Sequence, residues 1–197
     1  MNIIERVKRI LMTPATEWEI IKAEQASVSG LFSNYAVILA AIPAAAGFIG
    51  FSFFGISSGY GSFKFSIGTT LTWAVVSYIM SLIGVFVVGY VIDFLAPNFG
   101  STKDLVSSMK VAVYAYTAAW VGGIFNLIPS LAIVSALAGI YSLVLLYKGI
   151  ESIKMPPANK LVSYFVVTLL IAIVIFFITG ALLSPILMKG NVMYGTL

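Results

Sequence analysis

Two ionisable side chains, Asp93 and Lys110, lie inside the long uncharged stretches of the sequence. A charged side chain in lipid is costly and normally finds a partner, so the sequence predicts an Asp93–Lys110 pair. Such a pair acts as a proton or ion relay or as a structural contact, and a lysine near the end of a span can also reach the interface with its ammonium group. The structural role is favoured here, because a relay usually needs more than one isolated pair.

The residue types that are missing exclude several kinds of active site. The chain has no Cys and no His. The usual zinc and haem sites and the Ser-His or Cys-His nucleophiles are therefore excluded. An intramembrane aspartyl protease needs two facing carboxylates, and of the two aspartates Asp104 is placed to begin a helix after Ser101-Thr102. We therefore expect no enzyme activity, no cofactor and no metal.

The overall composition is that of an integral membrane protein. Of the 197 residues, 60% are hydrophobic and 9% are charged, whereas a soluble domain has about 25% charged residues. The net charge of +4 therefore indicates membrane orientation, with no nucleic-acid partner expected.

Apolar runs separated by residues typical of turns predict an all-α, polytopic fold. The five expected transmembrane helices cover about 31–54, 67–95, 104–127, 129–153 and 161–183. Residues 1–30 are expected to form short cytoplasmic or interfacial helices, and residues 31–197 one membrane domain. Pro43 should kink the first span, either as a packing feature or as part of a substrate site.

The distribution of Lys and Arg predicts the orientation. With the N-terminus inside, five spans place nine basic residues on the inside and only Lys64 and Lys189 on the outside. The positive-inside rule therefore predicts a cytoplasmic N-terminus and an external C-terminus.

The first 25 residues hold eight of the 18 charged residues. Residues 3–11 form an amphipathic helical pattern, Thr13-Pro14 interrupts it, and Thr16-x-x-Glu19 has the form of a capping box for a second helix. This segment is either an anchor on anionic lipid or on a partner, or a segment that packs on the ends of the spans. The residues expected to contact the membrane surface or a partner are Arg6, Lys8, Arg9, Trp18 and Lys154.

Small residues at helical spacing predict close helix packing. Ala115, Ala119 and Gly123 share one face of the third span, and Gly139 lies on the fourth. Such residues let helices approach each other, either within the bundle or between two copies of the chain.

Several stretches together resemble one known family. They are TPATEWEIIKAEQ, LFSNYAVILAAIPAAAGFIG, YAYTAAWVGGIFNLIP and GIYSLVLLYKGIESIKMPPANK. Nearly the whole chain is similar to the Ypt/Rab-interacting-protein (YIP) domain family in its short prokaryotic form. The resemblance implies a cytoplasmic N-terminus, five spans and no catalytic residue, and its eukaryotic members are scaffolds in vesicle traffic.

These observations predict a non-enzymatic membrane scaffold in a prokaryotic cytoplasmic membrane, acting through its N-terminal segment and loops. The expected partners are the lipid bilayer, a cytoplasmic or membrane protein, and a second copy of the chain. The alternative is a small transporter or channel for an ion, proton or lipid that uses Pro43, Asp93 and Lys110.

Overall fold

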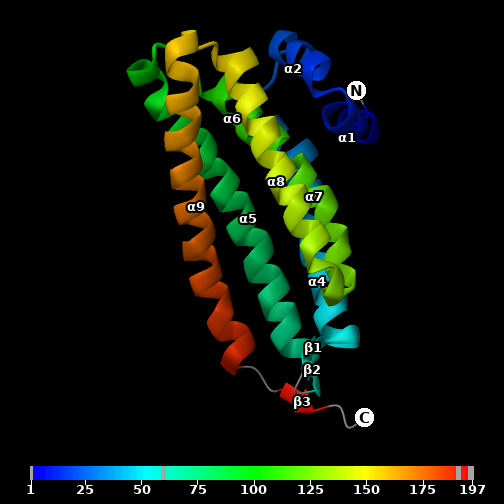
Figure 1. Ribbon diagram of the computed structural model, residues 1–197. Coiled ribbons are helices and arrows are strands. Elements are labelled where there is room, and N and C mark those ends of the chain that lie inside the picture. Colours follow the sequence, from blue (N-terminus) through cyan, green and yellow to red (C-terminus); the bar gives the residue numbers. More distant parts are fainter. Residues whose placement is uncertain (1, 59–60, 190–191, 195–197) are drawn as a thin grey trace.

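The computed structural model describes residues 2–58, 61–189 and 192–194, and it shows a bundle of helices that run up and down (Figure 1). In these residues, four helical segments are long and apolar enough to cross a membrane, namely Val28–Phe54, Ile67–Phe99, Pro129–Lys154 and Ala158–Met188. The all-α membrane fold is therefore confirmed. The protein is an integral membrane protein in contact with the lipid bilayer.

Each of these segments is built from shorter helical elements. The first consists of α3 (Val28–Leu31), the π-helix η1 (Phe32–Ala36), α4 (Val37–Ile49) and the π-helix η2 (Gly50–Phe54). The second is α5 (Ile67–Leu95) with the 3₁₀ turn η3 (Ala96–Phe99). The 3₁₀ turn η5 (Pro129–Leu131), α8 (Ala132–Gly149) and the π-helix η6 (Ile150–Lys154) form the third, and α9 (Ala158–Lys189) forms the fourth.

The expectation of five continuous spans is wrong at the predicted third span, 104–127. This segment begins with Asp104 as the N-cap and divides into α6 (Leu105–Ala115), α7 (Thr117–Gly122) and the 3₁₀ helix η4 (Gly123–Leu127). At the break, the hydroxyl of Thr117 donates to the carbonyl of Tyr114 at 2.7 Å. The backbone N–H of Ala119 donates to Ser142 Oγ on α8 at 2.9 Å. These side-chain hydrogen bonds accompany the break, because Ser and Thr compete with helical bonding. The N–H groups of Tyr116 and Trp120 still donate to the carbonyls four residues before them.

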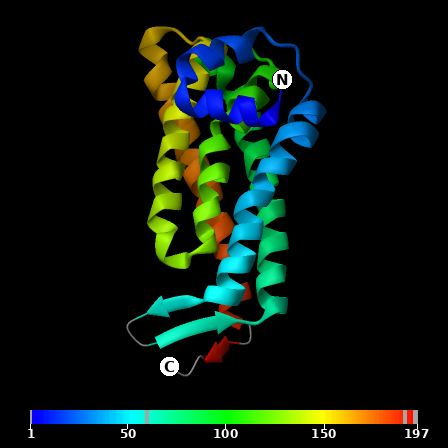
Figure 2. The same cartoon turned by 90° about the vertical axis from the view of Figure 1, so that its right-hand side faces the viewer.

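The two ends of the bundle differ in structure. Strands β1 (Ile56–Ser58), β2 (Gly61–Phe65) and β3 (Val192–Tyr194) form an antiparallel sheet in the order β1-β2-β3 at one end, here called the sheet end. The sequence pattern did not predict this sheet. Helices α1 (Ile3–Met12) and α2 (Pro14–Ala23) lie at the opposite, N-terminal end (Figures 1 and 2).

Helix α2 begins two residues before the predicted capping box. Pro14 occupies its first turn and Thr13 precedes it without a side-chain capping bond. Proline suits the first helical position because its fixed φ is already helical and its missing N–H would have no partner there. The Thr16-x-x-Glu19 pattern therefore lies inside the helix.

Small residues allow close packing at some of the predicted positions. Ala115 is buried, and a Cβ added at Gly123 would lie 2.5 Å from the Cβ of Pro43. A Cβ at the adjacent Gly122 would overlap the Cβ of Ala138. A Cβ added at Gly139 would meet no heavy atom within 4 Å in the described residues, so no close approach there requires a glycine.

These contacts give a prediction with a matched control. Gly122→Leu should lower the free energy of unfolding by about 1–3 kcal/mol or more, because the added side chain has no space against α8. Gly139→Leu should change it by less than about 0.5 kcal/mol. Unfolding in mixed detergent micelles would measure both. An equal loss at Gly139 would show that another copy of the chain covers that face.

Candidate functional site

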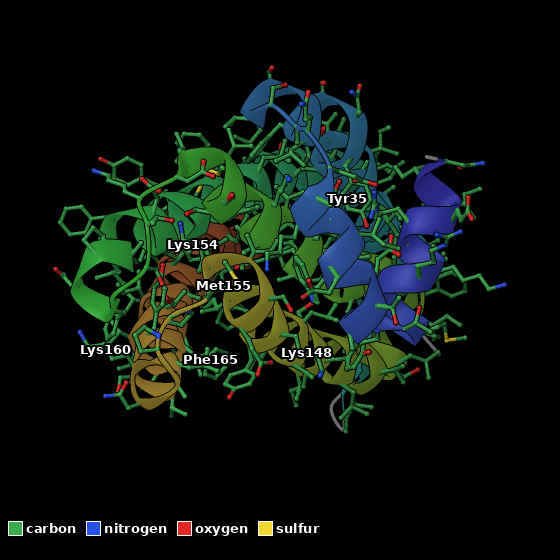
Figure 3. The ribbon with its side chains drawn as sticks, turned by 90° about the horizontal axis from the view of Figure 1, so that it is seen from above. Tyr35, Lys148, Lys154, Met155, Lys160 and Phe165 are labelled. Atoms are coloured by element: carbon green, nitrogen blue, oxygen red, sulfur yellow. The ribbon has the colours of Figure 1, made fainter. Side chains whose placement is uncertain are left out.

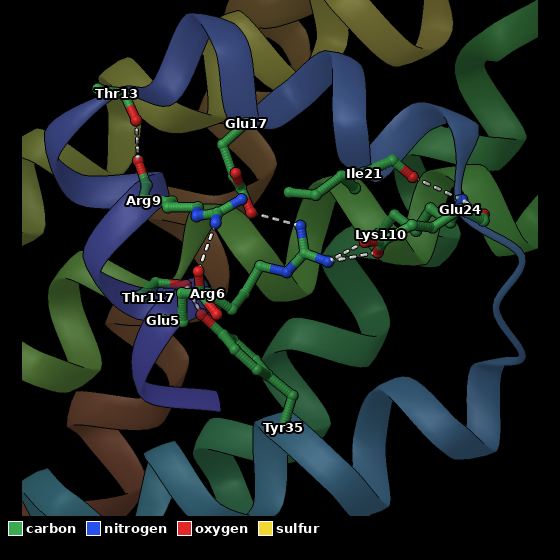
Figure 4. Close-up of polar contacts among 10 residues, drawn as sticks. All are labelled: Glu5, Arg6, Arg9, Thr13, Glu17, Ile21, Glu24, Tyr35, Lys110 and Thr117. Atoms are coloured by element: carbon green, nitrogen blue, oxygen red, sulfur yellow. Dashed lines mark hydrogen bonds and ion pairs between the residues drawn. The ribbon is translucent and has the colours of Figure 1, made fainter. Parts of the chain in front are cut away.

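The N-terminal helices are fixed to the bundle by a group of charges, here called the docking cluster (Figure 4). It consists of the buried Arg6, Glu17 and Lys110 and the partly exposed Glu24. Arg6 Nη1 donates to Glu17 Oε1 at 2.5 Å, and Arg6 Nη2 donates to both carboxylate oxygens of Glu24. The side chains of Arg6 and Glu17 are 6% and 1% exposed. The docking cluster contains two positive and two negative charges, which is the condition for burying charge at a tolerable cost.

Helical spacing explains how these residues meet. Arg6 and Ile10 are four residues apart and form the buried face of α1. Glu17, Ile21 and Glu24 follow the i, i+4, i+7 spacing, which places them on one face. Opposite charges that border the apolar stripes of two neighbouring helices are therefore compatible with a buried ion pair. The sequence carries this signal at Arg6 and Glu17.

The docking cluster also contacts the membrane bundle. Lys110 Nζ on α6 donates to the carbonyl oxygen of Ile21 at 2.8 Å and to that of Glu24. The guanidinium carbon of Arg6 lies 5.3 Å from the ring centre of Tyr114, within the range of a cation–π contact. Burial lowers the pKa of Arg6, but the hydrogen bond to Glu24 and the nearby negative charges raise it by more, so Arg6 remains charged.

A polar cavity of about 570 Å³ lies beside the docking cluster. Its walls include Arg6, Glu24, Asn34, Tyr35 and Tyr114. The Tyr35 hydroxyl and Thr117 Oγ1 are 2.8 Å apart, which joins the first span to the broken third segment directly below this cavity. The cavity thus separates the N-terminal segment from the first span on one side of the bundle.

The structure corrects three of the five predicted surface contacts. Arg6 of α1 and Trp18 of α2 are buried between these helices and the bundle. Lys154 is also buried, with its Nζ 2.8 Å from the carbonyl oxygen of Thr102. Lys8 and Arg9 are exposed, and Arg9 pairs with Glu5 along α1. Figure 3 shows Lys154 inside the bundle, whereas Lys160 lies at the rim.

The predicted Asp93–Lys110 pair is also wrong. Asp93 is buried and accepts a hydrogen bond from Ser108 Oγ at 3.3 Å. Lys110 instead points toward α2, where it binds backbone carbonyls. In the described residues Asp93 forms no ion pair with a lysine, and its charge lies nearer to that of Lys154 than to that of Lys110.

Double-mutant cycles should distinguish these two lysines. Asp93→Asn and Lys154→Met should couple by about 0.5–3 kcal/mol, because the two opposite charges lie near each other on the same side of the bundle. Asp93→Asn and Lys110→Met should add to within about 0.5 kcal/mol, because Asp93 and Lys110 share no partner. Unfolding in detergent measures all variants. Coupling with Lys110 alone would restore the pair predicted from sequence.

A second cavity of about 280 Å³, here called the membrane cavity, lies between α4, α5, α7 and α9. Its walls include Pro43, Ala44, Trp73, Tyr116 and Trp120. Neither Asp93 nor Lys110 lines it, nor does any other Asp, Glu, Lys or Arg. In the described part of the chain, no group of three or more His, Cys, Asp or Glu side chains could hold a metal ion.

The comparison with protein families agrees with this architecture. The family model of the Yip1 domain matches residues 8–180. The chain belongs to the Yip1 domain family. This confirms the resemblance to the YIP family. The matched range contains every residue that lines the membrane cavity except Leu183, and every residue of the docking cluster except Arg6.

Similar proteins are found in Escherichia coli. Proteins called inner membrane protein YohC, from strain K12 and from strain O6:H1 CFT073, are each 34% identical to this Yip1 domain chain over 143 residues. The match covers 71% of this chain and 73% of each relative. No solved structure gives a significant match.

Proposed function

We propose that this Yip1 domain protein is a non-enzymatic membrane scaffold that acts through α1, α2 and the neighbouring loops. The observation that supports it most directly is the docking cluster, which holds α1 and α2 in one position while Lys8 and Arg9 remain exposed. A fixed surface with exposed charge is suited to a protein partner or to anionic lipid headgroups. The occupant of that surface is either another protein or a second copy of the chain.

The proposed orientation places the N-terminal end in the cytoplasm. All charged residues except Lys64 and Lys189 belong to segments at this end, including nine of the 11 basic residues. The positive-inside rule then places this end inside. The names of the E. coli relatives support a location in the bacterial cytoplasmic membrane.

The absence of enzyme activity is part of the proposal. General acid–base catalysis needs a titratable group within reach of a bound substrate. The carboxylates of Glu17 and Asp93 are instead buried against Arg6 and Ser108. The membrane cavity carries no carboxylate or amine among its walls.

The alternative function, a transporter or channel that uses Pro43, Asp93 and Lys110, has less support than the scaffold. Pro43 lines the membrane cavity, but Asp93 and Lys110 are outside it and are engaged elsewhere. A substrate path would need to connect these positions. Flux in reconstituted vesicles that Asp93→Asn or Lys110→Met abolishes, with the fold retained, would overturn the scaffold proposal.

Site-specific photocrosslinking in native membranes tests the scaffold directly. Photoreactive residues at Arg9 and Lys160 probe exposed positions at the N-terminal end, and one at the exposed, lipid-facing Leu137 serves as the control. We expect the first two positions to capture the same discrete protein, or the chain itself, and Leu137 to capture lipid. Capture of lipid alone at all three positions would contradict the proposal.

A further inference from the structure

The membrane cavity lies beside two of the helix irregularities of the transmembrane region. Pro43 interrupts the hydrogen-bond ladder of α4, and Tyr116 marks the break between α6 and α7. Both residues line the cavity. Irregular backbone within a membrane is tolerated where it is buried in protein or lines a cavity, so this position is where a site would be expected.

The cavity opens among apolar side chains that face the bilayer. Phe176 lines it from α9 and is 72% exposed, and the adjacent Phe177 is 68% exposed. The surroundings of these side chains are hydrocarbon, because the segment Ala158–Met188 is the most apolar of the four candidate spans. With no charged residue in its walls, the cavity is unsuited to an ion or a charged headgroup.

The walls of the cavity carry a few polar groups, and two of these groups can still donate a hydrogen bond to a ligand. Ser81 Oγ accepts from Trp120 Nε1 at 3.0 Å, and Asn126 Oδ1 accepts from Ser135 Oγ at 2.9 Å. The amide nitrogen of Asn126 and the hydroxyl of Tyr116 donate no hydrogen bond to any residue in the described ranges. An apolar ligand with one carbonyl acceptor would satisfy either donor.

We propose that the membrane cavity holds one acyl chain of a membrane lipid, with its ester carbonyl accepting from Asn126 or Tyr116. The chain enters beside α9 and lies against Trp73 and Trp120. Pro43 and the break at Tyr116 shape the wall that receives it. This site is separate from the docking cluster, so it does not depend on the proposed scaffold role.

Tryptophan fluorescence in vesicles with brominated acyl chains tests this site. Bromine quenches tryptophan at short range, and a Trp73→Phe background leaves Trp18 and Trp120, which are 0% and 2% exposed. Because both side chains are buried, brominated chains in the surrounding bilayer do not contact either of them directly. We expect clear quenching of Trp120 in phosphatidylcholine vesicles that carry brominated chains.

Matched phenylalanine substitutions supply the control. Ala44→Phe fills the cavity from α4, whereas Ala45→Phe places the same ring on the exposed side of α4. Thr179→Phe and Ile178→Phe repeat the comparison on α9, in case one variant does not fold. We expect the cavity-filling variants to lose at least half of the quenching and the exposed variants to keep it.

Two results would overturn the proposal. Equal quenching in filled and exposed variants would show that the chains reach Trp120 from outside the cavity. Absence of quenching in the Trp73→Phe protein would show that no chain enters. Native mass spectrometry of the unmodified protein gives an independent check, because a retained phospholipid should be lost from the Ala44→Phe variant and kept in the Ala45→Phe variant.

Discussion

Replacing Arg6 by Met should cost about 3–5 kcal/mol of stability, because it leaves a buried carboxylate without its partner. Glu17 is 1% exposed and Arg6 is its only ion-pair partner in the described residues. Glu24 also loses a charge-assisted contact but is 39% exposed, so water can partly replace it. Unfolding in mixed micelles would measure the loss, and proteolysis near Thr13 would report whether α1 and α2 have detached.

A double variant and a surface control complete this test. Arg6→Met with Glu17→Gln should recover a large part of the loss, because no buried charge is then unpaired. Arg9→Met removes a pair whose side chains are 44% and 49% exposed, and it should cost at most about 1 kcal/mol. Equal losses for Arg6 and Arg9, or no recovery in the double variant, would contradict the structural role of the docking cluster.

Hydropathy predicts the class of this fold well because the physical constraint is strong. A backbone in lipid must satisfy its own hydrogen bonds, so long uncharged runs become helices. The same reasoning does not detect the break at Tyr116. At that break the N–H of Ala119 donates to Ser142, a residue of α8 that meets Ala119 only after the bundle has formed.

The charged positions are harder to predict for a similar reason. A pattern along one helix places Arg6 on the polar face, and its burial depends on Glu17 and Glu24 from a second helix. Asp93 and Lys110 are close in depth, but their side chains turn to different partners. Sequence can therefore suggest that a charge needs a partner without specifying which one.

The sequence also does not specify which small residues meet a partner helix. Gly122 and Gly139 both belong to small-xxx-small patterns in neighbouring segments. A Cβ added at the first would overlap Ala138, whereas one added at the second would meet no heavy atom within 4 Å in the described residues. The pattern predicts that a helix can be approached closely, but the partner surface decides whether it is.

Trp18 should be the other position where one substitution has a large effect. Its side chain is fully buried at the contact between α2 and the bundle, with its ring 6.4 Å from that of Tyr114 in an edge-to-face arrangement. A Cβ added at Gly149 would lie 2.8 Å from the Trp18 ring, so the absence of a side chain at Gly149 leaves the space that the ring occupies. Trp18→Ala should cost about 3–5 kcal/mol, from lost burial and the cavity that remains.

Variants on both sides of this contact separate docking from general instability. Trp18→Phe should cost less than Trp18→Ala because it keeps an aromatic ring, and the indole N–H that it removes has no partner in the described residues. Gly149→Leu should expel Trp18 and expose the α1–α2 segment to protease, whereas Gly180→Leu, with no described neighbour within 4 Å, should leave that segment protected. If the segment stays protected in Gly149→Leu, the contact with Trp18 does not hold it, and the docking cluster must do so alone.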